Sequence, residues 1–173
     1  MEHLKDKILK INTFIFDFDG VLSDGKVYTM ADGEQVRATN VKDGYALHYA
    51  LTKGYNIAII SGGYAQSIPL RFKTFPGIEI YMRVRDKIAQ FNQYLADHQL
   101  TNEQVLVMGD DIPDYPMLQL AAVKCCPQDA SEEIKAIVDY ISPCNGGNGA
   151  VRDVIQQVMK AQGKWMNEDA FIW

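Results

Sequence analysis

FIFDFDGVLSDG (residues 14–25) joins a run of large apolar residues to two carboxylates and a glycine turn. The run Phe14–Phe16 is too short for a helix and predicts a buried β-strand. Asp17 and Asp19 follow it, two positions apart. Because like charges at that spacing repel one another, the pattern predicts that other groups of the chain compensate them.

The composition of the 173-residue chain is that of a globular protein, with 47% hydrophobic and 23% charged residues. The net charge of −5 gives no support to nucleic-acid binding, and no stretch of roughly 18 apolar residues predicts a membrane span. Residues 1–10 are too charged for a signal peptide. An odd number of cysteines is typical of a reducing compartment. We therefore expect a cytoplasmic protein that binds neither nucleic acid nor membrane.

Short apolar runs alternate with amphipathic segments along the chain. Strands are predicted at 13–16, 57–60, 105–108 and 122–125. Helices are predicted from an N-cap at Asp43 to about Thr52, over 87–99, from Ser131 onward, and from about Ala150 to Lys160. This alternation predicts an α/β fold with a doubly wound, Rossmann-like parallel sheet that is covered by helices on both faces.

One segment interrupts the alternation directly after the first strand. Residues 26–38 hold two short runs around Asp32-Gly33, a dipeptide typical of hairpin turns. We therefore predict a small β-hairpin insertion at about residues 24–40, rather than a plain surface loop. The apolar tail at about 161–173 is expected either to fray or to dock on a neighbouring subunit. Residues 1–173 are interpreted as a single domain.

Polar side chains gather at the strand ends, the edge where ligands bind in open parallel sheets. They are Asp17 and Asp19 after the first strand, Ser61 after 57–60, Lys87 before a helix, and Asp110, Asp111 and Asp114 after 105–108. Carboxylate ligands without a Cys/His spacing favour Mg²⁺ over zinc. Magnesium, an ammonium and a hydroxyl together predict a site for a phosphoryl group. A carboxylate at such a site can act as nucleophile through an aspartyl-phosphate.

Four ordered motifs resemble those of the haloacid dehalogenase superfamily over essentially the whole chain. They are Asp17-Phe18-Asp19-Gly20-Val21, Ser61-Gly62, Lys87 and Gly109-Asp110-Asp111-Ile112-Pro113-Asp114. With VKDG (41–44) and GGNGAVRDV (146–154), the chain is similar to the capless phosphatases of 3-deoxy-D-manno-octulosonate 8-phosphate. Segment 146–154 resembles one that relatives fold toward a neighbouring site, or it is only a helix-entry loop. The resemblance implies a Mg²⁺-dependent hydrolase of a small sugar-acid phosphate.

The resemblance also implies a role for each residue of the first three motifs. Asp17 attacks phosphorus and binds Mg²⁺. Asp19 protonates the leaving alcohol, then activates water, and ligates the metal through its backbone carbonyl. Ser61 and the Gly62 amide hold phosphoryl oxygens, and Lys87 offsets the negative charge.

The fourth motif and the oligomer supply the remaining expectations from this resemblance. Asp110 is implied as a direct Mg²⁺ ligand, with Asp111 and Asp114 orienting metal-bound waters or Lys87. Members of this group form tetramers in which the hairpins associate and a neighbour closes the site. Arg71 matches an arginine that reaches the substrate carboxylate across that interface, and an exposed helix residue is the alternative reading.

The sequence leaves the substrate and two other functions open. Gly63 stands where octulosonate phosphatases commonly carry arginine and enzymes for nine-carbon, sialic-type 9-phosphates can carry glutamate, so a nine-carbon substrate is an alternative. A phospho-receiver signalling module has a similar acidic pocket, but its acceptor aspartate would follow a middle strand, which here ends at Ser61. An inactive subunit of a bifunctional nucleotidyltransferase is disfavoured because every catalytic position is filled.

Overall fold

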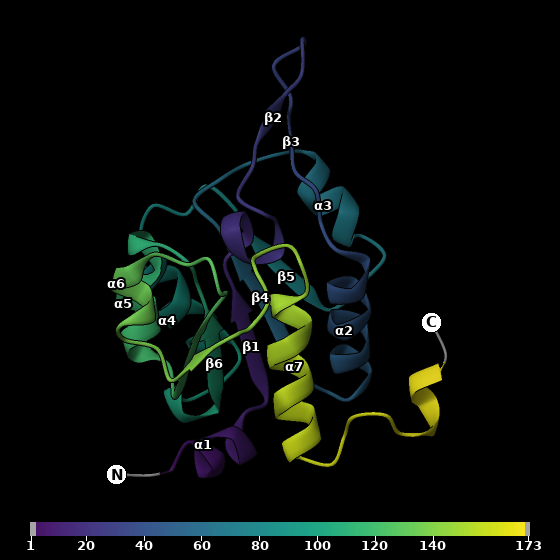
Figure 1. Ribbon diagram of the computed structural model, residues 1–173, viewed down its shortest axis with the longest axis vertical. Coiled ribbons are helices and arrows are strands. Elements are labelled where there is room, and N and C mark those ends of the chain that lie inside the picture. Colours follow the sequence, from purple (N-terminus) through teal and green to yellow (C-terminus); the bar gives the residue numbers. More distant parts are fainter. Residues whose placement is uncertain (1–2, 172–173) are drawn as a thin grey trace.

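A six-stranded parallel sheet forms the centre of the molecule (Figure 1). The computed structural model describes residues 3–171. The strands of the sheet are β1 (Thr13–Phe16), β4 (Asn56–Ile60), β5 (Ile78–Tyr81), β6 (Val105–Met108), β7 (Val123–Cys126) and β8 (Tyr140–Ile141). Their order is β5-β4-β1-β6-β7-β8, with every neighbouring pair parallel. Because the chain continues to one side of β1 and later to the other, the carboxyl end of β1 lies at the switch point where ligands bind.

Helices cover both faces of the sheet. They are α1 (Leu4–Lys10), α2 (Val41–Thr52), α3 (Ser67–Phe72), α4 (Lys87–Asp97), α5 (Tyr115–Leu120), α6 (Glu132–Lys135) and α7 (Ala150–Ala161), with short turns η1 (Phe18–Leu22), η2 (Asn102–Gln104), η3 (Ile112–Asp114) and η4 (Glu168–Phe171). Phe14 and Phe16 pack in one core with α2 and α7, whereas Ile15 packs in a second core with α4 and α5. Alternate residues of a strand face opposite sides, so one short apolar run serves two cores. The predicted doubly wound α/β fold is confirmed.

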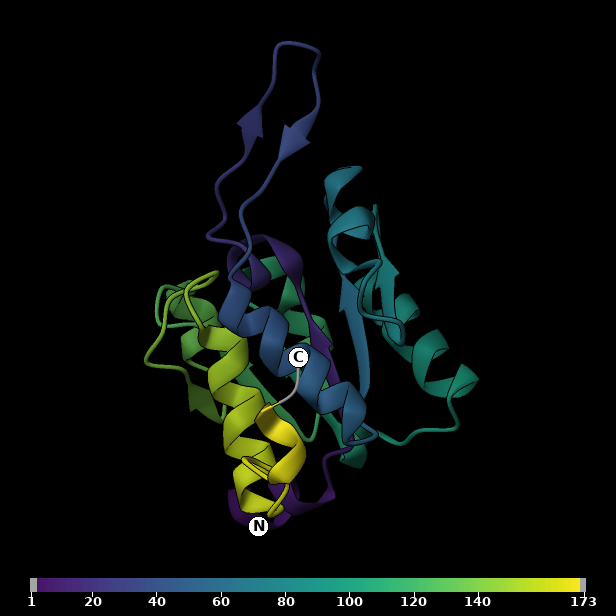
Figure 2. The same cartoon turned by 90° about the vertical axis from the view of Figure 1, so that its right-hand side faces the viewer.

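The predicted hairpin is present and stands away from the sheet (Figures 1 and 2). Its strands, β2 (Tyr28–Thr29) and β3 (Gln35–Val36), pair in antiparallel fashion. At the tip, Gly33 has a φ of +86° and donates its amide hydrogen to the carbonyl of Met30. Glycine adopts this φ without steric cost, which is why the Asp-Gly dipeptide marks the turn.

Five helices and strands of the described chain lie outside the sequence prediction: α1, α3, α5, β5 and β8. All four residues of β5 are only partly buried, and its sequence, Ile-Glu-Ile-Tyr, is not the continuous apolar run by which the other strands of the sheet were predicted. The strand predicted at 122–125 is present as β7, one residue later. Within residues 3–171, no helix has the length and apolar character needed to cross a membrane.

The sequence predicts Asp43 as the N-cap of α2, which is wrong. Asn40 is the cap, and its side-chain oxygen accepts a hydrogen bond from the amide of Lys42 at 2.8 Å. Asp43 lies buried in the first turn and accepts from the amides of Arg152 at 2.7 Å and Gly149 at 3.3 Å. It therefore caps α7 and joins two helices that are distant in sequence.

The tail at about 161–173 packs on its own chain, as far as the structure describes it. Trp165 meets the ring of Tyr49 edge-on, with 5.6 Å between ring centroids. Asp169 accepts from Lys53 Nζ at 2.6 Å and from the Tyr49 hydroxyl at 3.2 Å. In the described residues the tail is therefore not frayed, because it packs on α2 of its own chain; docking on a neighbouring subunit stays a prediction. The last two residues of the chain lie outside the described range.

Replacing Asp43 with alanine should lower the free energy of unfolding by about 1–2 kcal/mol, because two amides at the start of α7 lose a buried acceptor. Urea denaturation measures this change. Asp43→Asn keeps one side-chain oxygen and should lose less. An alanine variant as stable as the parent would contradict the capping role.

Candidate active site

The site is built around the carboxyl end of β1. The amide of Asp17 donates to the carbonyl of Met108 at 3.0 Å, so its backbone still belongs to the sheet. The chain then turns through η1, where Gly20 has a φ of +87°. A Cβ atom on Gly20 would lie 2.0 Å from Oδ2 of Asp110. Glycine therefore allows the turn that carries Asp19 to approach the carboxylate that follows β6.

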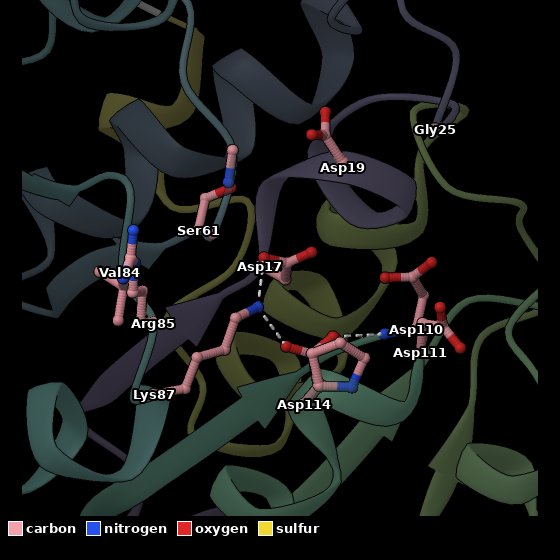
Figure 3. A pocket seen from close by; sticks show the side chains of 13 residues that line it. Asp17, Asp19, Gly25, Ser61, Val84, Arg85, Lys87, Asp110, Asp111 and Asp114 are labelled. Carbon is pink, nitrogen blue, oxygen red and sulfur yellow. Dashed lines mark hydrogen bonds and ion pairs between the residues drawn. The ribbon is translucent and has the colours of Figure 1, made fainter.

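Lys87 contacts two carboxylates in the centre of the site (Figure 3). Its Nζ lies 2.7 Å from Oδ1 of Asp17 and 2.5 Å from Oδ1 of Asp114, and all three side chains are buried. Lys87 is the first residue of α4, whose N-cap Asp86 accepts from the amide of Ala89 at 3.0 Å. The cap fixes where α4 begins and so places the ammonium against the end of β1.

The loop after β6 brings the remaining carboxylates of the fourth motif. Asp114 accepts from the Asp110 amide at 3.1 Å through Oδ2, so one carboxylate holds both this loop and Lys87. A Cβ atom on Gly109 would lie 2.5 Å from the Cβ of Asp114, which requires glycine at that position. Asp111 accepts from the amide of the next residue at 2.8 Å, and its side chain is exposed.

Three carboxylates form a cluster that fits a divalent cation. One oxygen each from Asp17, Asp110 and Asp114 lies within 4.8 Å of the other two. Burial raises the pKa of Asp17, and the charge of Asp114 adds to the rise despite the opposing effect of Lys87. Burial, followed by the charges of Asp17 and Asp114, raises the pKa of Asp110 to about 8. One ammonium does not compensate three carboxylates, and an all-oxygen donor set with surplus negative charge suits Mg²⁺.

A cavity of about 420 Å³ opens over the cluster. The predicted site residues that line it are Asp17, Asp19, Ser61, Gly62, Lys87, Asp110, Asp111 and Asp114. Ser61 is buried, and its hydroxyl oxygen accepts from the amide of Gly63 at 3.1 Å, while Gly62 is exposed. Arg71 is not among the lining residues, because its Nε donates to the Thr39 hydroxyl at 3.2 Å. The structure therefore gathers every predicted residue except Arg71 in one place.

Arg37 is a functional-site residue that the motif pattern missed. Its Nε and Nη2 donate to the two carboxylate oxygens of Asp19 at 2.9 and 3.0 Å, and its Nη1 donates to the Tyr64 carbonyl at 3.3 Å. The sequence signal that could have found Arg37 was its position on the second limb of the predicted hairpin. The second limb of the hairpin must return past the end of β1, so a cation on that limb lies close to the acidic turn.

The glycine-rich segment 146–149 packs against η1 and against the chain that leads from η1 into the hairpin. The amide of Gly147 donates to the Val21 carbonyl at 2.9 Å. A Cβ atom on Gly146 would lie 1.8 Å from the carbonyl oxygen of Gly20, so the two backbones are in direct contact. The described contacts favour the interpretation of this segment as the loop that enters α7, with an added role in holding η1.

Comparison with known proteins is consistent with this geometry. The family model for haloacid dehalogenase-like hydrolases matches residues 64–155. A curated 3-deoxy-D-manno-octulosonate 8-phosphate phosphatase of Salmonella typhi is 35% identical over 162 residues, covering 94% of this chain and 86% of the relative. The chain belongs to the octulosonate 8-phosphate phosphatase family of haloacid dehalogenase-like hydrolases. The resemblance drawn from four motifs is thereby confirmed.

Solved structures of this phosphatase family share the fold. One from Yersinia pestis has a TM-score of 0.90 and 33% identity, covering 93% of this chain and 87% of that one. One from Moraxella catarrhalis, in complex with a magnesium ion, a phosphate ion and a KDO molecule, has a TM-score of 0.91 and 31% identity, with 98% of each chain covered. The donor set around Asp17 and Asp110 is thus of the kind that holds Mg²⁺.

Magnesium should stabilise this phosphatase more strongly at pH 8 than at pH 5.5. The pKa of Asp110 is about 8 in the folded protein, above its ordinary value of 3.8. Between these values the unfolded chain has released a proton that the metal-free fold retains, so rising pH destabilises the metal-free fold. Mg²⁺ binds the ionised carboxylates and removes that penalty. Thermal unfolding with and without Mg²⁺ across this pH range measures the effect.

Asp110→Asn is the matched control for this prediction. The variant lacks the titrating carboxylate, so its melting temperature should respond less to Mg²⁺ and should fall less steeply than that of the parent as pH rises. A Mg²⁺-induced shift that is the same at both pH values in the parent would contradict the prediction.

Proposed function

We propose that this chain hydrolyses 3-deoxy-D-manno-octulosonate 8-phosphate to 3-deoxy-D-manno-octulosonate and inorganic phosphate. The observation that carries the proposal is the buried contact of Lys87 with Asp17 and Asp114 beneath the cavity. A desolvated carboxylate held by an ammonium presents an oxygen to phosphorus with little rearrangement. Relatives from Salmonella typhi and Escherichia coli that are named for this reaction support the choice of substrate.

Asp17 and Asp19 divide the chemistry in this proposal. A carboxylate oxygen of Asp17 bonds to phosphorus as the ester P–O bond breaks, and the departing alcohol oxygen takes a proton from Asp19. Asp19 then accepts a proton from a water molecule whose oxygen attacks the aspartyl-phosphate, which releases phosphate and restores Asp17. Both residues line one cavity, which supports their action on one phosphoryl group.

The transferred phosphoryl group needs donors and positive charge. In the proposal, the Ser61 hydroxyl and the Gly62 amide donate to phosphoryl oxygens, and Lys87 offsets the charge beside the nucleophile. The position of Ser61 and Gly62 on the cavity wall supports these roles.

The metal assignment rests on the acidic cluster. We propose that Asp17, Asp110 and the backbone carbonyl of Asp19 hold Mg²⁺, which supplies neutralising charge for the phosphoryl oxygens. Asp111 and Asp114 are proposed to orient metal-bound waters or Lys87. The contact of Asp114 with the Lys87 ammonium supports the second role.

Nine-carbon 9-phosphates are the alternative substrates because Gly63 supplies neither diagnostic side chain. Phosphate release in the presence of Mg²⁺, measured side by side on both substrates, separates the two. We expect kcat/KM to be higher for the eight-carbon substrate. The opposite preference would assign the chain to nine-carbon sugar acids, and a long-lived phospho-aspartate with negligible turnover would support a receiver module.

Asp17→Asn should lower kcat by at least about a thousandfold, because the amide is a poor nucleophile and a weaker metal ligand. Steady-state phosphate release from the octulosonate 8-phosphate measures the loss. Asp97→Asn makes the same chemical change on the exposed surface of α4 and should leave turnover intact. Retained turnover in Asp17→Asn would refute the nucleophile.

We also propose that the chain forms a cytoplasmic homotetramer in which the hairpins associate and neighbours complete each site. Val27, Tyr28 and Met30 of the hairpin are 43%, 56% and 53% exposed, which supports a contact that covers them. The three free cysteines fit a reducing compartment. A single sheet positions the whole site, which supports a single domain over residues 1–173 with the hairpin inserted at about 24–40.

Arg71→Ala should raise the KM for the octulosonate 8-phosphate about tenfold or more, while p-nitrophenyl phosphate is little affected. Arg71 lies over the ring of Phe75 at 5.1 Å and outside its own cavity, so the proposed carboxylate contact is made in a neighbour's site. Lys73→Ala, an exposed cation beside α3, is the control, and light scattering checks the oligomeric state. Equal losses on both substrates would contradict this role.

A further inference from the structure

The hairpin contributes a cation to the proton-transfer residue. The guanidinium of Arg37 binds both carboxylate oxygens of Asp19 in a two-pronged pair at 2.9 and 3.0 Å. The Arg37 side chain is 4% exposed, whereas that of Asp19 is 31% exposed. A bidentate pair fixes the plane of the carboxylate as well as its position, and burial of the arginine protects the pair from competing water.

The loop that follows β4 holds the Arg37 guanidinium in place from a second side. Nη1 of Arg37 donates to the carbonyl of Tyr64, in the loop that follows β4. Beside Gly33 at the tip of the hairpin, the side chain of Glu34 accepts from the amide of Gln66 at 3.0 Å. The second limb of the hairpin is therefore joined to the loop that begins with Ser61 at two places, Glu34 and Arg37. Because Arg37 is anchored to this loop, its orientation does not depend on Asp19 alone.

Gly63 leaves the space that the pair occupies. A Cβ atom on Gly63 would lie 2.8 Å from Oδ2 of Asp19 and 3.3 Å from Nη2 of Arg37. The first of these distances is shorter than a van der Waals contact, so a side chain at this position would push against the pair. The absence of a side chain at Gly63 therefore leaves the space in which the Arg37 guanidinium pairs with Asp19.

We propose that Arg37 is a positioning residue that sets the carboxylate of Asp19 for proton transfer to and from the cavity. The inference rests on the proposed function, in which Asp19 is the acid and base. The Arg37 guanidinium occupies one acceptor position on each oxygen of Asp19, and a carboxylate has about four acceptor positions in all. The Ser23 hydroxyl donates to Oδ1 as well, at 3.4 Å. The positions that remain serve the leaving oxygen and the attacking water, because Asp19 lines the cavity and Arg37 does not.

Arg37→Ala tests this role through the leaving group. The octulosonate leaves its 8-phosphate as an alcohol that needs a proton, whereas p-nitrophenolate leaves p-nitrophenyl phosphate without one. We expect kcat/KM, which covers the steps up to phosphoryl transfer, to fall roughly 10- to 100-fold for the first substrate and to change less than about threefold for the second. Equal losses on both substrates, or a gain in activity, would overturn the proposal.

Three controls separate positioning from other roles. Glucose 6-phosphate has an alcohol leaving group without a carboxylate, so its kcat/KM should fall in parallel; a loss confined to the octulosonate 8-phosphate would show a substrate contact instead. Lys26→Ala removes an exposed cation from the other hairpin limb and should leave the ratio of the two rates unchanged. Millimolar guanidinium should restore the alcohol phosphates selectively in Arg37→Ala, with urea as the neutral comparison.

Gly63→Ala keeps the proposal testable if Arg37→Ala does not fold. The added methyl group should displace the pair while Arg37 remains, and should lower kcat/KM for the alcohol phosphates more than for p-nitrophenyl phosphate. The same rate ratio as in the parent would overturn the proposal. Failure of the proposed function is recognised separately, by turnover that survives Asp17→Asn.

Discussion

The ammonium of Lys87, held between Asp17 and Asp114, is the contact on which the rest of the site depends. It requires the end of β1, the start of α4 and the loop after β6 to meet at one point. Buried charges persist only with partners, and here Asp110 leaves the site with more negative than positive charge. Burial first, and the excess of negative charge second, raise the pKa values of Asp17 and Asp110. A divalent cation resolves this imbalance, so the fold stores local electrostatic strain that metal binding relieves.

Close backbone approach is the second condition for this site. Gly20 meets the Asp110 carboxylate on one side and Gly146 on the other, and Gly109 makes room for Asp114. In each case a single added carbon would overlap an existing atom. The turn that carries Asp19 is therefore fixed by neighbours on both sides. This explains why segment 146–149, far from the catalytic motifs in sequence, is made of small residues.

The parts of the site that could be predicted are those that follow from chain order. Residues directly after parallel strands must gather at one edge, which placed Asp17, Ser61 and the acidic loop after β6 correctly. The partner of Asp43 and the exact pairing of Arg37 with Asp19 do not follow from strand order. The partner of Asp43 is 109 residues away, and that of Arg37 is 18 residues away across a hairpin. Periodicity reports which face of an element is buried, and it carries no information about which polar partner lies across a packed interface.

The hairpin stands where a doubly wound fold would ordinarily begin a helix. Its contacts show what a hairpin adds at this place. A hairpin that served only to meet another subunit would need no contact with the catalytic turn. Here Arg37 binds Asp19, and Glu34, beside the tip glycine, binds the loop after β4, so the second limb of the hairpin contacts both Asp19 and the loop that begins with Ser61. The exposed apolar residues Tyr28 and Met30 lie on the first limb, which pairs with the second limb through β2 and β3. A contact of another subunit with Tyr28 and Met30 would therefore act on the limb that carries Arg37, and through Arg37 on Asp19, the residue proposed for proton transfer.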